Sequence, residues 1–286
     1  MTTEPRDPRL SFDRVPEDYE KARHQYPPEA FEWLFDYLWE GRSADVADIL
    51  EIGPGTGQAT ESLLRHGARV EAIEIGPNLA AFLRAKYAGN DALEVVTGEF
   101  EKVELASTFD LVLAATSFHW LDPEVRLEKA HQLLRPAGVL GILSTVPIRS
   151  SEDRGFFQRN DGIYRRWGRD GPPFDPPEEN DVRPPEYDEL QSSGLFADVL
   201  FRRFRWDQRY TAETYAQLLR SYSDIQMMQT TQREGLISDL RDFIEQEFDG
   251  HVVRPLVICL TVGRVNPARD ELFNRRTGPC VARAIR

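Results

Sequence analysis

Three glycines between Ile49 and Gln58 form the part of the sequence with the clearest chemical meaning. The segment reads ILEIGPGTGQ, in which an apolar run ends at Ile52 and glycine then occupies every second position. Glycine lacks a Cβ atom, so such a turn can adopt positive φ angles and let a ligand approach the backbone closely. A helix that follows the turn offers free N–H groups to that ligand. The pattern predicts a ligand-binding turn, although purely structural turns between a strand and a helix use glycine as well.

Glu74 is the second candidate for ligand binding. It ends the next predicted strand, 19 residues after Gly55. In an open α/β fold, a carboxylate at this place can accept hydrogen bonds from both hydroxyl groups of a ribose. An acidic residue also suits an ordinary exposed strand end, but its spacing from the glycine turn favours sugar binding.

The spacing of the glycines distinguishes between two kinds of nucleoside ligand. The dinucleotide fingerprint G-x-G-x-x-G requires a third glycine at position 58, where this chain has Gln58. The pattern is G-x-G-x-G instead, and Glu51 stands two residues before its first glycine. A carboxylate there could reach the ammonium group of a nucleoside that carries an amino acid, a group that nicotinamide dinucleotides lack.

At these residues the chain resembles the class I S-adenosylmethionine-dependent methyltransferases. Within this class it is similar to the small-molecule, methyltransferase type 11 group that includes trans-aconitate-type and ubiquinone/menaquinone-type enzymes. Further similar segments are AIEIGPNL at 72–79, TGEFE at 97–101, SFHWLDP at 117–123, LLRPAGVL at 133–140 and the amino-terminal arm FDRVPEDYEKARHQYP at 12–27. The segment 146–206 has no counterpart in this resemblance.

The resemblance implies S-adenosyl-L-methionine as the cofactor, with no metal ion. It implies Glu74 as the ribose ligand, and it leaves the adenine to Glu99 or to the backbone next to Phe100, because Glu99 stands where many relatives have aspartate. The full set of implied cofactor-binding residues is Tyr19, Arg23, Glu51, Gly53, Gly55, Thr56, Gly57, Gln58, Glu74, Ile75, Glu99, Phe100, Thr116 and Trp120.

His119 is the candidate catalytic residue. A sulfonium-bound methyl group is already activated, so the enzyme must mainly align the acceptor and exclude water. A hydroxyl acceptor would also need a general base, and a histidine after the fourth strand suits that task. His119 could instead only brace its loop, and an anionic acceptor would need no base. The aromatic residues Tyr19, Tyr26, Phe118 and Trp120 could face the sulfonium or could belong to the core.

Short apolar runs alternate with helical patterns in the middle of the chain, which predicts a mostly parallel sheet with helices on both faces. A helix over residues 30–39, with Gly41 after it, precedes these runs, and Asp122 and Pro123 have the residue types that start a helix. The resemblance implies a Rossmann-like, seven-stranded sheet whose last strand is antiparallel. The predicted strands are Asp48–Ile52, Val70–Ile75, Leu93–Val96, Phe109–Ala114, Val139–Ser144, part of Val199–Trp206 and Val252–Val262, and helices are expected at Tyr215–Leu219 and Leu236–Phe248.

We expect three regions along the chain. Residues 1–145 would contain the amino-terminal arm and the cofactor-binding half, and residues 207–286 would complete the sheet and end in a tail. Residues 146–206 combine many prolines with many aromatic side chains, which predicts a lid or substrate-binding insertion of short helices, followed by the sixth strand.

Composition excludes several function classes. The 286 residues are 41% hydrophobic and 29% charged, which is typical of a folded globular protein. A net charge of −13 disfavours a nucleic-acid partner. Apolar stretches are shorter than the roughly 20 residues of a membrane helix, and Met1–Leu10 has no signal-peptide core, so we expect a cytoplasmic protein without membrane contact. Cys259 and Cys280 form neither a metal-binding nor a disulfide pattern.

The sequence therefore predicts a methyltransferase that acts on a small-molecule acceptor. One alternative is a nucleotide-dependent oxidoreductase, which Gln58 disfavours. Another is a non-catalytic binding protein that retains the fold, which is disfavoured because three glycines have a conformational cost that an inactive site would not require. The oligomeric state and the identity of the acceptor are not predicted.

Overall fold

The computed structural model describes residues 9–10, 13, 20, 25–43, 45–169, 171 and 174–267. The strands are β1 (Asp48–Ile52), β2 (Arg69–Glu74), β3 (Leu93–Thr97), β4 (Phe109–Ala115), β5 (Leu134–Pro147), β6 (Phe196–Thr211) and β7 (His251–Val265). The longer helices are α2 (Pro28–Trp39), α3 (Gln58–Arg65), α4 (Pro77–Lys86), α5 (Arg126–Gln132), α8 (Pro185–Ser193), α9 (Ala212–Arg220) and α11 (Thr230–Glu247). Shorter ones are α6 (Phe156–Arg159), α7 (Asp161–Arg166) and α10 (Ser223–Gln226).

The seven strands form one sheet in the order β3-β2-β1-β4-β5-β7-β6. Strands β1 to β5 pair in parallel, whereas β7 is antiparallel to both of its neighbours. This arrangement confirms the predicted Rossmann-like, mostly parallel sheet with one antiparallel strand. The order reverses direction at β1, so the carboxyl ends of β1 and β4 flank the crevice where open α/β sheets bind ligands.

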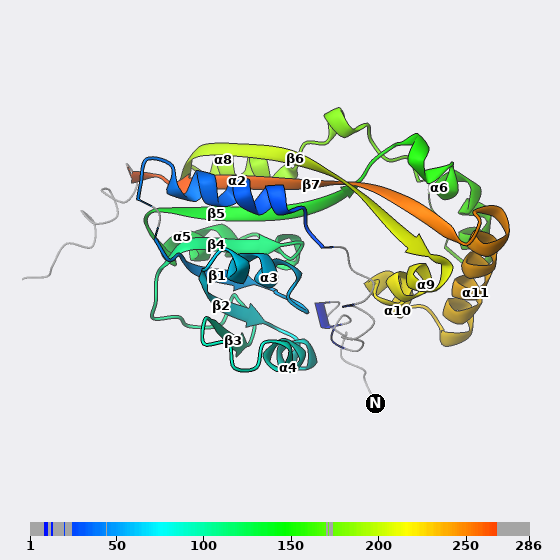
Figure 1. The fold of residues 1–286 in the computed structure, drawn as a ribbon, viewed down its shortest axis with the longest axis horizontal. Coiled ribbons are helices and arrows are strands. Elements are labelled where there is room, and N and C mark those ends of the chain that lie inside the picture. Colours follow the sequence, from blue (N-terminus) through cyan, green and yellow to red (C-terminus); the bar gives the residue numbers. More distant parts are fainter. Residues whose placement is uncertain are drawn as a thin grey trace, which may run out of the picture.

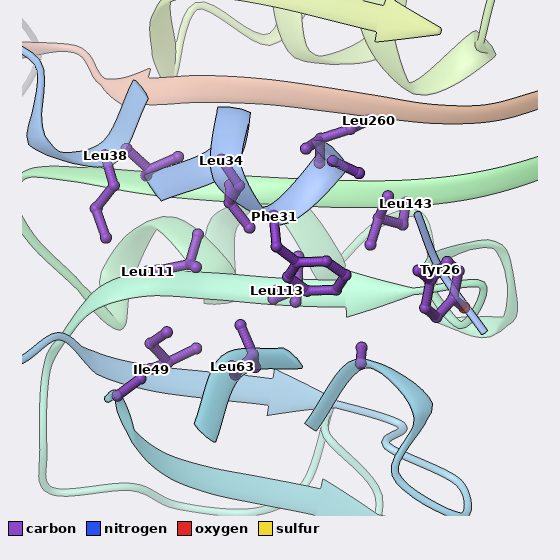
Figure 2. Close-up of a cluster of buried hydrophobic side chains, with 14 of the residues drawn as sticks. Tyr26, Phe31, Leu34, Leu38, Ile49, Leu63, Leu111, Leu113, Leu143 and Leu260 are labelled. Carbon is purple, nitrogen blue, oxygen red and sulfur yellow. The ribbon is translucent and has the colours of Figure 1, made fainter. Parts of the chain in front are cut away.

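Helices cover both faces of the sheet, because side chains of successive strand residues point to opposite sides. On one face, α2 and α3 pack on the strands through Phe31, Leu34 and Leu63, together with Ile49 and Leu111 of the sheet. Figure 2 shows this cluster, with the α2 side chains directed at the strands. On the other face, α5 and α8 pack against the alternate residues of the same strands. Both helical layers were predicted from the sequence pattern.

A third core lies beyond the end of the sheet, where β6 and β7 extend past the other strands (Figure 1). Helices α9 and α11 contribute most of its buried residues, and Phe156 of α6 lies at its centre in contact with the rings of Phe157, Tyr215 and Phe248. The short helices α6 and α7 of the predicted insertion thus join helices from the carboxyl-terminal part of the chain in one unit.

Several predicted elements have other boundaries in the structure; helix α11, for example, begins at Thr230 rather than Leu236. Strand β5 begins at Leu134 rather than Val139, and strand β6 runs from Phe196 to Thr211 without interruption. Helix α5 begins at Arg126, so Asp122 does not cap it. The Asp122 carboxylate accepts a hydrogen bond from the Glu124 N–H at 2.9 Å instead, because an aspartate can stabilise a turn with its own backbone two residues on.

No helix in the described part of the chain combines the length and the apolar character that crossing a bilayer requires.

Candidate functional site

A cavity of about 280 Å³ lies at the carboxyl ends of the parallel strands. Its volume is close to the lower end of the range of about 300–1,000 Å³ that is usual for small-molecule sites. The residues that line it come from the turns after β1, β2, β3 and β4 and from one distant segment near α10. The lining residues that the sequence predicted as site residues are Gly53, Gly55, Glu74, Ile75, Glu99, Phe100, Thr116, His119 and Trp120.

The glycine turn connects β1 to α3 and forms one wall of the cavity. Gly55 lies on the wall with a φ angle of +59°, a conformation that side chains with a Cβ atom rarely adopt. Gly57 has a different reason to be glycine. A Cβ atom there would lie 2.6 Å from the Leu83 side chain, so α3 and α4 could not pack as they do. Only Gly55 of these two faces the space that a ligand would occupy.

Glu74 holds the turn from the opposite side. Its side chain is only 4% exposed, and it accepts hydrogen bonds from the backbone N–H groups of Gly55 at 3.0 Å and Gly76 at 2.8 Å. A carboxylate has about four acceptor positions, so lone pairs remain for further donors. Burial raises the pKa of Glu74, while the two backbone N–H groups lower it. The carboxylate is therefore fixed at the cavity wall with unused acceptor capacity.

Glu51 lies behind the turn and does not line the cavity. Its side chain is 1% exposed, and one oxygen accepts a hydrogen bond of 2.6 Å from the Thr60 hydroxyl. The other oxygen, Oε1, is buried and has no hydrogen-bond partner in the described part of the chain. Burial, with a smaller contribution from the nearby Glu74, raises the pKa of Glu51 from 4.5 to about 7. A buried oxygen of this kind is a favourable place for a positive group or a water molecule.

The raised pKa of Glu51 predicts how stability depends on pH. Between pH 4.5 and about 7 the folded chain keeps a proton that the unfolded chain has released, so the free energy of unfolding falls as pH rises through this window. We expect Glu51→Gln to remove this fall, which amounts to about 3 kcal/mol, because an amide has no proton to lose. The measurement is urea unfolding of the ligand-free protein at pH 5 and pH 8.

Glu32→Gln is the matched control, because Glu32 is an exposed acid on helix α2. It should leave the pH dependence of the wild type unchanged. If the free energy of unfolding changes with pH by the same amount in the wild type and in Glu51→Gln, Glu51 does not titrate in this range.

The wall beyond β3 contains the predicted adenine contacts. Phe100 is buried, and both Phe100 and Glu99 line the cavity. The Glu99 carboxylate forms ion pairs with Lys102 at 2.7 Å and with Arg9 at 3.5 Å. A carboxylate with two cationic partners is a weaker candidate for an exocyclic amine, so the backbone next to Phe100 is the better of the two predicted adenine contacts.

The wall after β4 is built on a strained residue. Thr116 has a φ angle of +56°, which is uncommon for a β-branched residue and typical of functional sites where the surroundings enforce it. Its hydroxyl oxygen lies 2.8 Å from the Tyr26 hydroxyl oxygen, which connects the arm to the end of β4. His119 and Trp120 follow in a short helical turn, with ring centroids 5.0 Å apart. Phe118, in contrast, is buried in the core and does not line the cavity.

Three residues of the amino-terminal part of the chain contact the segments around the glycine turn and the cavity, and one of them, Arg9, lines the cavity. Arg9 lies 3.3 Å from Glu101, and Asp13 accepts hydrogen bonds of 2.8 Å from the backbone N–H groups of both Asn78 and Leu79 at the start of α4. Glu20 accepts hydrogen bonds from Lys86 at 2.7 Å and from Gln58 at 3.1 Å. Through Glu20 and Gln58, these contacts bring this part of the chain next to the glycine turn.

The remaining predicted residues lie elsewhere. Thr56 is fully buried, and its hydroxyl accepts a hydrogen bond from the Gln58 amide at 2.7 Å, so these two stabilise the turn from behind together with Gly57 and Glu51. Direct contact between these four residues and a ligand stays a prediction. Tyr19 and Arg23 lie outside the described residues.

Sequence reasoning missed several residues of the cavity. Arg9, Ser117 and Leu121 are near predicted motifs in sequence or in space. Tyr222 and Asp224 come from the loop and the short helix after α9, about 100 residues beyond β4. They lie in Tyr210–Met228, a segment that the sequence suggests for the acceptor pocket without singling out a residue. No local pattern identifies such residues, since only the tertiary fold brings them to the cavity.

Comparison with known proteins agrees with this geometry. Residues 50–142 match the family model described as methyltransferase domain. An uncharacterized methyltransferase of Mycobacterium tuberculosis is 35% identical over 144 residues, which are 50% of this chain and 55% of the relative, so the chain spans about half the length of the curated relatives it matches. A ribosomal RNA small subunit methyltransferase A of Synechococcus sp. is 41% identical over 73 residues, 26% of each chain.

The fold has solved counterparts as well. A type II methyltransferase candidate from Anaeromyxobacter dehalogenans superposes with a TM-score of 0.57 at 19% identity, over 86% of this chain and 99% of that one. These findings confirm the resemblance to the class I methyltransferases, and residues 50–142 are a methyltransferase domain. Membership of the trans-aconitate-type group stays a prediction.

Proposed function

We propose that the chain, which contains a class I methyltransferase domain, is an S-adenosylmethionine-dependent methyltransferase that acts on a small-molecule acceptor in the cytoplasm. The observation that carries the proposal is the buried Glu74 carboxylate, held by the N–H groups of Gly55 and Gly76 at the wall of a cavity and still able to accept hydrogen bonds. A ribose with two adjacent hydroxyl groups supplies matching donors.

The residues at the cavity fit a nucleoside that carries an amino acid. Glu74 would bind the ribose, the apolar side chains Ile75 and Phe100 would pack against the adenine, and the bare backbone at Gly55 would let the ligand approach closely. Oε1 of Glu51, which has no hydrogen-bond partner among the described residues, lies behind the turn, where a nearby ammonium group would favour the ionised carboxylate. The chemistry that S-adenosylmethionine supplies when bound is a methyl group on a positively charged sulfur, whose C–S bond breaks as an electron-rich acceptor atom attacks.

The protein's own contribution is then alignment, exclusion of water and, for a protic acceptor, removal of a proton. Trp120 and Arg9, which both line the cavity, would shield the reacting atoms from solvent. His119 lines the same cavity and is exposed, so its imidazole can take a proton from an acceptor and release it to solvent.

The role of His119 gives a prediction about kinetics. We expect His119→Ala to lower kcat by about 100-fold for a hydroxyl acceptor, because general base catalysis is worth that much or more. Affinity for S-adenosylhomocysteine should stay within about 2-fold of the wild type, since the ribose and adenine contacts are elsewhere. The measurement is release of S-adenosylhomocysteine from S-adenosylmethionine in the presence of hydroxylated aromatic acids, followed from pH 5.5 to pH 9. An unchanged kcat with an unchanged pH profile would exclude His119 as the base.

A direct test of the proposed function is calorimetric titration of the purified chain with S-adenosylhomocysteine and with NAD. We expect binding of the first and none of the second, whereas binding of NAD alone would support an oxidoreductase. Absence of binding to either would support a non-catalytic protein that retains the fold. The net charge of −13 favours a small-molecule acceptor over the phosphate backbone of a nucleic acid. Methylation of structured RNA, together with no methylation of any small molecule, would overturn this part of the proposal.

A further inference from the structure

A second cavity of about 430 Å³ adjoins the first. Tyr222 and Asp224 line both cavities, so these two residues form a common wall. The other walls of the second cavity come from α6 and α7 of the insertion, from α9 and from β7. The segment without a counterpart in the family resemblance therefore contributes to a space directly next to the proposed cofactor cavity.

The carboxylates of this second cavity are already paired. Asp161 forms an ion pair with Arg165 at 2.8 Å, and Asp224 forms one with Arg169. Arg169 also lines the cavity, so its charge is balanced within the wall.

Arg254 of β7 differs from these arginines, because it has no carboxylate partner in the described part of the chain. One Nη group donates a hydrogen bond to the Tyr222 hydroxyl, and the guanidinium lies over the Tyr222 ring, 5.6 Å from its centroid. The Nε atom is buried, and no described residue supplies it with a hydrogen-bond acceptor. An arginine side chain is always charged, so the cavity contains a buried positive charge that its own side chains do not neutralise.

The tyrosines around Arg254 do not supply the missing negative charge. Burial raises the pKa of Tyr164, and it raises the pKa of Tyr215 strongly, so both phenols are neutral at physiological pH. Their rings give the cavity aromatic walls.

A second unsatisfied donor belongs to a residue that lines the same cavity. Asn160, between α6 and α7, is 2% exposed, and its amide Nδ2 has no hydrogen-bond acceptor among the described residues. Buried donors without acceptors are rare in folded proteins and call for a specific partner. Arg254 and Asn160 therefore both require acceptor oxygens that the described chain does not provide.

We propose that the second cavity binds the methyl acceptor, and that this acceptor is a small aromatic or other planar apolar molecule with one carboxylate, held by Arg254 and Asn160. The proposal rests on the proposed function, because the shared wall is what connects this cavity to the transfer of a methyl group. Arg254 lines only the second cavity, so the carboxylate serves as an anchor and the methyl group goes to another atom of the acceptor.

Charge balance favours a carboxylate over a phosphate monoester. Among the described residues, Arg254 gives the cavity one uncompensated positive charge, and a carboxylate neutralises it with two oxygens in the geometry that a guanidinium binds best. A phosphate dianion would bring a second negative charge close to the carboxylates of Asp161 and Asp224, which line the same space.

The test is calorimetric titration of the full chain with benzoate, phenylacetate and cinnamate, each beside its uncharged amide, and with phenyl phosphate, with and without saturating S-adenosylhomocysteine. We expect at least one carboxylate to bind about 10-fold or more tightly than its amide and than phenyl phosphate. Arg254→Met should weaken that carboxylate by about 10-fold or more and leave the amide unchanged. Arg209→Met is the matched control, because Arg209 is exposed on the adjacent strand β6 and lines neither cavity.

The outcomes separate this inference from the proposed function. If S-adenosylhomocysteine binds but every carboxylate binds no better than its amide, or Arg254→Met and Arg209→Met have equal effects, the acceptor proposal is wrong while the methyltransferase proposal stands. If phenyl phosphate binds more tightly than every carboxylate, the proposal that the acceptor carries a carboxylate is wrong as well. If S-adenosylhomocysteine does not bind, the proposed function fails first. Should Arg254→Met not fold, Asn160→Asp gives a second reading, since the added negative charge must weaken the bound anions of the panel and leave the uncharged amides unchanged.

Discussion

A Gly55→Val variant is expected to lose affinity for S-adenosylhomocysteine by at least ~100-fold while the chain remains folded. Gly55 lines the first cavity with a φ angle of +59°, so valine would place its branched side chain on a strained backbone at the cavity wall. The same change would displace the N–H group that holds Glu74, 3.0 Å away, and so would move the proposed ribose ligand as well. The measurement is calorimetric titration, with thermal unfolding of the same samples.

Gly67→Val is the control that separates the effect of backbone strain from the loss of the ligand-binding site. Gly67 has a φ angle of +78° in an exposed turn, and a Cβ atom there would meet no other atom within 4 Å. Both variants should lose a similar amount of stability, about 1–2 kcal/mol, but only Gly55→Val should lose the ligand. If Gly55→Val binds S-adenosylhomocysteine as tightly as the wild type, or if both variants lose the same amount of affinity for it, the glycine turn does not take part in ligand binding.

The predictable parts of the site are those whose positions in the fold are determined by the local sequence. The turn after β1 and the acid at the end of β2 are next to buried strands, and parallel strands bring their carboxyl ends to one edge of the sheet. Gly55 and Glu74 therefore meet, as their spacing predicted, and the structure joins them by a hydrogen bond. What the spacing could not show is that Glu51 and Thr56 lie behind the turn rather than on its open side.

The second cavity was not predictable, because its residues come together only through long-range packing. Asn160, Tyr222 and Arg254 lie on three separate elements that the pairing of β6 with β7 and the third core hold together. Strand β6 itself has a weak sequence signal, since arginines at alternate positions such as Arg203 and Arg205 lie at the edge of the sheet among apolar residues. An insertion of short helices was predicted from its prolines and aromatic residues, and its arginines, interleaved with acids, were expected to form ion pairs such as the one between Arg165 and Asp161.

Substitution of Glu74 tests the proposed ribose site directly. We expect Glu74→Gln to weaken S-adenosylhomocysteine by about 30-fold or more, since hydrogen bonds to a charged carboxylate are worth about 1.5–3 kcal/mol. In the wild type each carboxylate oxygen accepts a hydrogen bond from a backbone N–H group, one from Gly55 and the other from Gly76. The NH₂ group of glutamine would face one of these donors, so part of the loss would come from a loosened turn.

A ligand that lacks the ribose hydroxyl groups separates these two contributions. The 2′,3′-dideoxy analogue of S-adenosylhomocysteine cannot donate to Glu74, so it should bind the wild type about as weakly as S-adenosylhomocysteine binds Glu74→Gln. The affinities of Glu74→Gln for the two ligands should differ by less than about 3-fold. The hydrogen bonds between residue 74 and the ribose are already absent in this variant, so the effects of changing the residue and changing the ligand are not additive. If the hydroxyl groups contribute as much in the variant as in the wild type, Glu74 supports the turn but does not bind the sugar, and the observation that carries the proposed function would have a purely structural explanation.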